Sequence, residues 1–223
     1  MRLVIARAAV RLAVFDCDGT LVDSQANICR AMEAAFAGAA LAPPPRAAIR
    51  RIVGLSLVEA VAALLPDGEA AMHHGVAADY KRAFQQLRAN GTLDDEPLFE
   101  NIPEVLATLA DRGWMLGVAT GKSDRGLAHV LADHGIARHF ATLQTADRHP
   151  SKPDPAMLCA AIAEVGATRT VMIGDTSFDM AMARAAGVRA IGVTWGYHSA
   201  AELFASGADV VAEEVAALPG LLA

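Results

Sequence analysis

Two aspartates separated by one residue follow a short apolar run near the start of the chain, in the stretch VFDCDGTL. The run over residues 11–15 is rich in β-forming residues, and Gly19 interrupts it, which predicts a buried parallel strand ending in a loop. Because side chains alternate along an extended backbone, Asp16 and Asp18 point to one side and Cys17 points into the core. The two carboxylates are thereby presented together beyond the carboxyl end of a strand, where open α/β sheets bind ligands.

Three interpretations of this carboxylate pair are open on this stretch alone. Adjacent carboxylates repel each other unless a cation or a shared proton relieves the repulsion, so the simplest interpretation is a solvated acidic turn. A calcium loop of the EF-hand type fits poorly, because Gly19 comes too early and Asn27 stands where the closing Glu belongs. The third interpretation is a magnesium site with a carboxylate nucleophile.

The ends of three further predicted strands carry polar residues of matching chemistry. Thr120 follows one strand, Lys152 lies in the loop after the next, and Asp175 and Asp179 follow a third. Each is weak evidence alone, because a Thr after a strand is usually a helix cap, a loop Lys is usually solvated and Gly-Asp is a common turn. Their convergence on one crevice of a doubly wound sheet favours a single site.

Together these residues have the chemistry that hydrolysis of a phosphate monoester requires. That reaction needs up to ~10²¹-fold acceleration, which no single group supplies. Asp16 would attack phosphorus to form an aspartyl-phosphate, and Asp18 would protonate the leaving oxygen and then activate water. Thr120 and nearby backbone N–H groups would hold the phosphoryl oxygens, and Lys152 would supply positive charge. Asp16, Asp175 and the Asp18 backbone carbonyl would hold Mg²⁺.

Hydrophobic periodicity predicts an α/β chain that carries an inserted helical block. The predicted strands cover residues 11–15, 114–119, 141–144, 170–173, 190–193 and 209–211. The predicted helices cover residues 47–53, 57–65, 69–90 and 103–111, in addition to one capped by Ser24 and four that follow the later strands. The block from Ser24 to Asn90 contains no convincing strand, so we expect an all-helical insert whose chain returns to the sheet near residues 91–98.

Composition and charge limit the class of protein. The 223 residues suit one sizeable α/β domain or one domain with an insert, and 54% hydrophobic content supplies an ample core. A net charge of −6 argues against a binder of nucleic acid or of anionic membranes. Three widely spaced cysteines without a CxxC pair are typical of reduced thiols. The apolar start MRLVIARAAVRL is broken by two arginines and suits neither a signal peptide nor a membrane span, so we expect a cytoplasmic protein.

Four motifs occur in order at suitable distances: FDCDGTLVDS, VATGK, SKPDP and IGDTSFDMAMARAAG. With them the chain resembles a phosphatase of the haloacid dehalogenase superfamily, of the phosphoglycolate phosphatase-like type with a helical cap after the first strand. The resemblance covers nearly the whole chain. It implies a Rossmann-like catalytic core, residues 1–22 and 92–223, and a cap, residues 23–91. The acid at position 18 is similar to that of the phosphatases and phosphomutases, whereas the dehalogenases lack it.

The resemblance also implies Mg²⁺ as the cofactor and a small phosphorylated metabolite as the substrate, with 2-phosphoglycolate as the first candidate. By analogy, Asp179 would join the metal shell or orient Lys152. Many relatives have a hydrophobic residue at position 17 and Asn at position 121, where this chain has Cys17 and Gly121. Gly121 removes a side chain near the phosphate but keeps its N–H, so neither departure threatens the chemistry. The implied metal set is Asp16, Asp18, Asp175 and Asp179, and the implied catalytic set is Asp16, Asp18, Thr120 and Lys152.

In relatives, a cap loop at the position of residues 50–54 faces the active site. The resemblance therefore makes Arg51 and Gly54 candidate substrate contacts, beside Thr120, Gly121 and Lys152. An arginine there could hold a substrate carboxylate in a bidentate pair. The alternative is that Arg50 and Arg51 are ordinary solvated helix residues.

Several other residues have more than one interpretation from sequence. His73 and His74 lie among polar residues on a predicted helix, which favours the surface. Lys122 follows Thr120 and could border the pocket or be a solvated helix-entry lysine. Trp195, Tyr197 and His198 follow the fifth predicted strand and could line the rim of the site, although packing against the last helix explains Trp195 as well.

Other functions use the same residues. A sugar phosphomutase shares both aspartates, and inorganic pyrophosphatases and nucleotidases use the same core. A non-catalytic binding module would be marked by the loss of Asp16, Lys152 or Asp175, and none of them is lost. A monomer and a homodimer are both open, since the insert and Trp114 could serve an interface or an internal contact.

Overall fold

A parallel sheet forms the centre of the structure, a computed structural model that describes residues 9–223. Among these residues the sheet has six strands in the order β3-β2-β1-β4-β5-β6. They are β1 (Arg11–Phe15), β2 (Trp114–Thr120), β3 (Phe140–Thr145), β4 (Arg169–Gly174), β5 (Arg189–Val193) and β6 (Val210–Ala212). Because β1 lies between β2 and β4, the chain builds the sheet outward in one direction and then in the other. This is the doubly wound fold that the sequence predicts, and the reversal beside β1 is where such sheets bind ligands.

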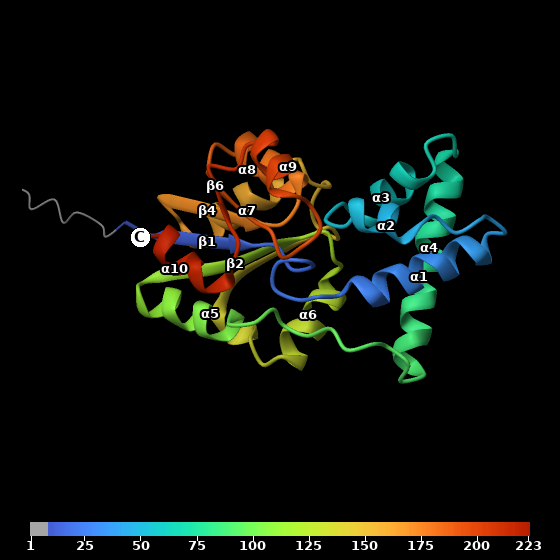
Figure 1. Cartoon of the computed structure of the whole chain (residues 1–223), viewed down its shortest axis with the longest axis horizontal. Coiled ribbons are helices and arrows are strands. Elements are labelled where there is room, and N and C mark those ends of the chain that lie inside the picture. The colour runs from blue at the N-terminus through green and yellow to red at the C-terminus, as the bar shows by residue number, and fades with distance from the viewer. Residues whose placement is uncertain (1–8) are drawn as a thin grey trace, which may run out of the picture.

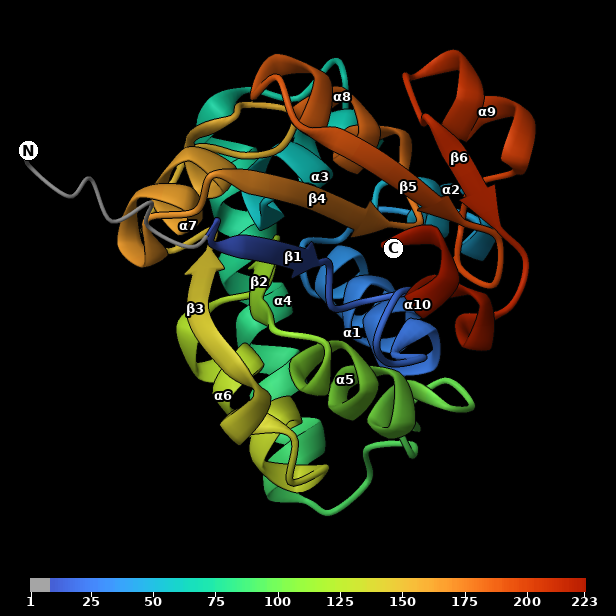
Figure 2. The ribbon, with the colours of Figure 1, turned by 90° about the vertical axis from the view of Figure 1, so that its left-hand side faces the viewer.

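Helices cover both faces of this sheet (Figure 1 and Figure 2). One face carries α5 (Ile102–Asp111), α6 (Asp124–Asp133) and α10 (Leu218–Leu221), whose apolar side chains form one hydrophobic cluster with the strands. The other face carries α7 (Ala156–Val165), α8 (Ser177–Ala185) and α9 (Ala200–Ala205), which form a second cluster. With both faces covered, the strands must be apolar on both sides, which explains their continuous hydrophobic runs.

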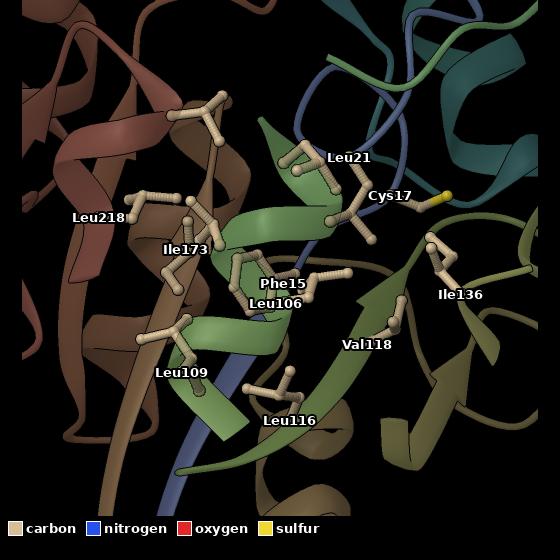
Figure 3. Close-up of a cluster of buried hydrophobic side chains, with 14 of the residues drawn as sticks. Phe15, Cys17, Leu21, Leu106, Leu109, Leu116, Val118, Ile136, Ile173 and Leu218 are labelled. Carbon is tan, nitrogen blue, oxygen red and sulfur yellow. The ribbon is translucent and has the colours of Figure 1, made fainter. Parts of the chain in front are cut away.

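The alternation of side chains along β1 divides its residues between these two clusters. Ala13 and Phe15 pack on the α5 side, whereas Leu12 and Val14 pack on the α7 and α8 side. Cys17 continues the Phe15 side and is buried in the same cluster (Figure 3). The prediction that Cys17 faces the core is therefore confirmed, and by the same alternation Asp16 and Asp18 face away from the α5 cluster.

Four consecutive helices stand beyond the carboxyl ends of the strands (Figure 1). They are α1 (Gln25–Gly38), α2 (Arg46–Arg51), α3 (Leu57–Leu64) and α4 (Ala70–Ala89), and we call residues 25–89 the helical insert. The insert has its own hydrophobic cluster, in which Ile28, Met32 and Phe36 form the buried face of α1 that the helical spacing predicts. The exact bounds of a core and a cap domain stay a prediction.

The insert leaves and rejoins the sheet at one place. Val22 pairs with Leu98 in an antiparallel bridge. The Asp23 N–H donates to the Pro97 carbonyl at 2.9 Å, and the Phe99 N–H donates to the Leu21 carbonyl at 3.0 Å. The outgoing and returning chains therefore lie side by side, and the return falls at the end of the predicted 91–98 segment.

The structure differs from the sequence-based expectation in three local features. Ser24 occupies the position before α1, but its side chain makes no capping hydrogen bond, because its hydroxyl donates to the Asp18 carboxylate instead. The weak third strand extends beyond the predicted 141–144, since its pairing with β2 continues to Thr145. The C-terminal helix α10 was not predicted, and Leu218 packs from it into the α5 cluster.

Trp114 makes an internal contact. Its side chain is buried, with the guanidinium groups of Arg11 and Arg169 at 5.1 and 5.5 Å from its ring centroid. Two cations over one indole account for the burial of this residue on β2 without a second chain. No helix within residues 9–223 is both long and apolar enough to cross a bilayer. The expectation that the apolar start is neither a signal peptide nor a membrane span concerns residues 1–12, of which residues 1–8 lie outside the described part of the chain.

We expect Leu106→Ala to destabilise the protein strongly, because the Leu106 side chain is fully buried between α5 and the sheet (Figure 3). Removing it should lower the free energy of unfolding by roughly 2–5 kcal/mol, measured by urea denaturation. The matched control is Met115→Ala on β2, where the side chain is 36% exposed and the change should stay within about 0.5 kcal/mol. Equal losses in the two variants would contradict this packing.

Candidate active site

Lys152 lies at the centre of a buried charge cluster. Its ammonium is 2.9 Å from Oδ1 of Asp16 and 2.6 Å from Oδ1 of Asp179, and none of the three side chains is more than 1% exposed. Although burial by itself lowers the pKa of Lys152, the two carboxylates reverse this and raise it. The lysine is therefore held charged. It comes from the loop between β3 and α7, so three separate segments meet at one ammonium.

Asp179 is fixed by the start of α8. Thr176 and Asp179 form a reciprocal capping box, in which the Thr176 hydroxyl and N–H donate to Oδ2 of Asp179 at 2.7 and 3.1 Å. Its other carboxylate oxygen accepts from Lys152. Of the two roles suggested for Asp179, the structure shows the contact that orients Lys152, and membership of a metal shell stays a prediction.

Asp175 follows β4, the strand that pairs with β1 in the sheet, and lies close to Asp16. Its Oδ1 accepts from the Thr20 hydroxyl at 2.8 Å, and its Oδ2 accepts from the Tyr197 N–H at 2.9 Å. Asp16, Asp175 and Asp179 each offer a carboxylate oxygen, and these oxygens all lie within 4.8 Å of one another. The predicted meeting of these residues is therefore observed.

The cluster has more negative charge than its lysine can neutralise. Burial raises the pKa of Asp16 to about 7, although Lys152 acts in the opposite direction. Burial raises the pKa of Asp175 well above its usual range, and the charges of Asp16 and Asp179 raise it further. One oxygen of Asp16, Oδ2, is buried without a hydrogen-bond partner. Three buried carboxylates around one ammonium form a donor set that suits a hard divalent cation such as Mg²⁺.

The Asp18 carboxylate does not join this group. It accepts from the Lys122 ammonium at 2.6 Å and from the Ser24 hydroxyl, and it is 6% exposed. Any contribution of Asp18 to a metal site would come from its backbone carbonyl, as the sequence argument supposed. Of the two interpretations of Lys122, the pocket residue is the one observed, because its side chain is only 12% exposed.

Thr120 ends β2 beside the same crevice. It is buried, and its hydroxyl accepts from the Lys122 N–H at 3.2 Å. The next residue, Gly121, lies directly under the loop that follows α2, because a Cβ there would overlap the Leu55 carbonyl oxygen and come within 2.8 Å of the Gly54 carbonyl oxygen. A side chain at position 121 would need this loop to move, which gives a physical reason for the glycine.

The loop at residues 51–56 of the insert rests on the strand ends. The Ser56 N–H donates to the Ser151 hydroxyl at 2.8 Å, and Nε2 of His198 lies 3.2 Å from the Arg51 carbonyl oxygen. Gly54 faces Thr176 at the start of α8. A cavity of about 870 Å³ lies between the insert and the sheet, and Asp18, Gly54, Gly121 and Lys122 line it. The insert thus closes over the crevice as a cap would.

The cap arginines point elsewhere. The Arg51 guanidinium is 2.5 Å from the Glu202 carboxylate on α9, and the Arg50 guanidinium donates to the Gln25 side chain at 3.1 Å. Both arginines line a smaller cavity of about 300 Å³ beside Trp195, not the larger one. The structure therefore does not bring Arg51 to the carboxylate cluster, and its contact with substrate stays a prediction. His73 is away from the crevice, within 2.9 Å of the Leu65 carbonyl oxygen, and His74 is exposed.

Sequence reasoning placed Tyr197 beside the site but missed the contacts that hold Asp175 and Asp18. Thr20 and Tyr197 fix Asp175, and Ser24 holds Asp18. The Tyr197 hydroxyl is buried without a hydrogen-bond partner, and its ring packs against the hydrophobic cluster of the insert. Ser24 was interpreted as a helix cap because its position before α1 is typical of one. Its short distance from Asp18 along the chain was the one signal in the sequence for the contact with that carboxylate.

Comparison with known proteins identifies the family. The profile of the haloacid dehalogenase-like hydrolases matches residues 13–193. The chain belongs to the haloacid dehalogenase-like hydrolase family. It is 34% identical over 217 residues to the Dickeya dadantii protein named "Probable phosphatase IndB", covering 94% of this chain and 92% of that protein. It is 31% identical to the phosphoglycolate phosphatase of Agrobacterium fabrum, covering 93% and 90%.

Solved structures agree with this membership. A haloacid dehalogenase-like hydrolase from Bacteroides fragilis superposes with a TM-score of 0.85 at 25% identity, covering 94% of this chain and 99% of that chain. A structure from Haemophilus somnus described as a predicted phosphoglycolate phosphatase has a TM-score of 0.80 at 24% identity, with 96% and 98% covered, and at that identity the likeness shows the fold alone. The expectations of this superfamily and of a phosphatase-type hydrolase are confirmed.

Without metal, we expect the free energy of unfolding of the hydrolase to fall as the pH rises from about 4 to about 7, because Asp16 loses its proton over this range. The pKa of Asp16 is raised from 3.8 to about 7 on folding, so the folded state binds more protons than the unfolded state within that window. Stability therefore falls with rising pH there and levels off above it. Asp16→Asn removes this titration.

The measurement is urea unfolding in EDTA at several pH values between 5 and 8. The free energy of unfolding of Asp16→Asn minus that of the unchanged protein should grow as the pH rises. A difference that stays constant across this range would show that Asp16 carries no such penalty.

Proposed function

We propose that this hydrolase is a magnesium-dependent phosphatase that cleaves a small phosphorylated metabolite through an aspartyl-phosphate intermediate. The observation that carries the proposal is the Asp16–Lys152–Asp179 charge cluster beside Asp175, with the unpartnered Oδ2 of Asp16. Such a group of strand-end carboxylates around one ammonium suits the transfer of a phosphoryl group, whose charge must be both neutralised and positioned.

Asp16 is the nucleophile in this proposal. Its Oδ1 is held by the Lys152 ammonium and by the Cys17 N–H at 2.7 Å, so the carboxylate has a fixed orientation. Its Oδ2 makes no hydrogen bond and is the oxygen free to attack phosphorus. Attack forms the Asp16–phosphoryl bond and breaks the bond to the leaving oxygen. Fixing one oxygen while leaving the other unbound prepares the carboxylate for in-line attack.

Asp18 is the acid and base. It lies two residues beyond the nucleophile on the same side of the chain and borders the large cavity. Ser24 and Lys122 hold its carboxylate in one position. From there Asp18 gives a proton to the leaving oxygen and then takes a proton from the water that attacks the phosphoryl group on Asp16.

Thr120 and Lys152 bind the phosphoryl group. The Thr120 hydroxyl and the N–H groups at the start of the following loop donate to its oxygens, and Gly121 leaves room for the backbone to approach. Lys152, held charged by Asp16 and Asp179, compensates the negative charge of the transferring group. When bound, Mg²⁺ would be held by Asp16, Asp175 and the Asp18 carbonyl, with Asp179 nearby, and would neutralise charge on the phosphoryl oxygens and on the carboxylates.

The first substrate to test is 2-phosphoglycolate, because several relatives carry the name phosphoglycolate phosphatase. Magnesium dependence and the aspartyl-phosphate step rest on the resemblance to the superfamily and on the carboxylate cluster. The protein is expected to act on a small molecule.

The test is phosphate release from a panel that includes 2-phosphoglycolate, hexose phosphates, nucleotides and pyrophosphate, with Mg²⁺ and with EDTA. We expect release with Mg²⁺, its loss in EDTA, and a loss of at least about 1,000-fold in kcat for Asp16→Asn, because the variant lacks the nucleophile. The matched control is Asp67→Asn in the exposed turn between α3 and α4, which should keep full activity.

Activity that survives in Asp16→Asn would overturn the mechanism. Analysis of the products by NMR separates hydrolysis from the phosphomutase alternative. Free phosphate marks a phosphatase, whereas an isomerised sugar phosphate that forms only with a sugar bisphosphate present marks a mutase.

A further inference from the structure

The large cavity between the insert and the sheet has walls that a two-carbon acid does not use. Its volume of about 870 Å³ is in the upper part of the range of pockets that hold drug-sized ligands. A two-carbon leaving group would fill only a small part of this space and leave the rest to water. The cavity is therefore larger than the first candidate substrate requires.

The apolar walls come from three helices of the insert. Ile28 and Met32 on α1 and Leu57 and Val58 on α3 line the cavity, together with two aromatic residues on α4. Leu57 and Val58 are only partly buried, so apolar surface faces the cavity uncovered. Uncovered apolar walls inside a cavity favour a ligand that buries an apolar face against them.

The aromatic wall gives the ligand a preferred shape. Tyr80 and Phe84 are one turn apart on α4, with ring centroids 6.0 Å apart and planes tilted by 37°. Both rings line the cavity and both are partly exposed. Planar rings bind against such a pair by stacking or by edge contacts. Aliphatic walls on α1 and α3 also line this cavity.

The aromatic wall is also close to the reacting end of the site. Asp18 and Lys122 line the same cavity as Tyr80 and Phe84. A leaving group whose oxygen lies at Asp18 can therefore extend within this cavity into the space bounded by the two rings. The cavity is also lined by charged residues of both signs, Lys81, Arg88, Arg125, Glu96 and Asp147, which suit polar substituents on a ring.

We propose that the preferred substrate is a phosphomonoester whose leaving group carries an aromatic or heteroaromatic ring, which the insert holds against Tyr80 and Phe84. This inference rests on the proposed phosphatase function and specifies its substrate class. The ring could belong to a nucleoside or to another aromatic alcohol, since both present the planar apolar face that these walls fit.

The test compares kcat/KM for benzyl phosphate, adenosine 5′-monophosphate, ethyl phosphate and 2-phosphoglycolate in Mg²⁺. Benzyl and ethyl phosphate both release a simple primary alcohol, so their ratio reports mainly on binding of the ring. We expect benzyl phosphate to exceed both ethyl phosphate and 2-phosphoglycolate by about tenfold or more. A higher value for adenosine 5′-monophosphate than for benzyl phosphate would identify the ring as that of a nucleoside, and the reverse order would identify another aromatic alcohol.

Two variants test whether the ring of the substrate binds in the cavity. Phe84→Ala removes part of the aromatic wall and should lower kcat/KM for ring-bearing substrates about tenfold, through KM, while ethyl phosphate and 2-phosphoglycolate stay unchanged. Val58→Trp adds bulk to the α3 wall and should have the same selective effect. The matched control is Phe204→Ala on α9, where the ring is 54% exposed and does not line the cavity.

The outcomes separate this inference from the proposed function. Hydrolysis of 2-phosphoglycolate at a kcat/KM equal to or above that of the ring-bearing substrates would overturn the inference and leave the phosphatase intact. An equal loss for every substrate in Phe84→Ala would also overturn it, because the residue would then support the fold and not the ring. Absence of hydrolysis with all four substrates would overturn both.

Discussion

The ammonium of Lys152, buried between Asp16 and Asp179, is the interaction on which the arrangement of the crevice depends. Removing charges from water costs several kcal/mol for each ion, so each partner of such a group is tolerated only because the others are present. The lysine comes from the loop after β3, one aspartate follows β1, and the other begins α8. One electrostatic requirement thereby fixes the relative positions of three segments that are far apart in sequence.

The local backbone is shaped to let these groups approach. Gly19 has a φ of +81°, and a Cβ there would overlap the Asp175 carboxylate. Gly196 approaches the same carboxylate from the loop after β5 and leaves no room for a side chain either. Glycines therefore stand where chain must pass next to buried charge, because any larger residue would push the carboxylate away. The close approach of these segments brings together three carboxylates, and the single ammonium of Lys152 does not neutralise them.

The fold could be predicted from sequence because its signals are local and repeated. Continuous apolar runs such as that of β1 indicated strands covered on both faces, and the uninterrupted helical block indicated the insert. Asp16, Thr120, Lys152 and Asp175 could be placed together because parallel strands end at one edge of a sheet. The contacts of Ser24, Thr20 and Tyr197 could not, because each depends on which of several nearby polar atoms a side chain meets after folding. The pairing of Arg51 with Glu202 depends likewise on how α2 and α9 approach, and no short-range pattern encodes that.

The insert is attached to the sheet by two chains that lie side by side, at Val22 and Leu98. Such an attachment resembles a loop of the parent fold that has been lengthened into a folded unit, because its two ends enter and leave at one point. The strand pairing of the sheet and the ion pairs of Lys152 with Asp16 and Asp179 involve no residue between Val22 and Leu98, whereas Asp18 depends on Ser24 within that segment. The geometry therefore allows the walls around a leaving group to change during evolution independently of the charge cluster at Lys152. A lineage could acquire a new substrate by exchanging one continuous segment of its gene.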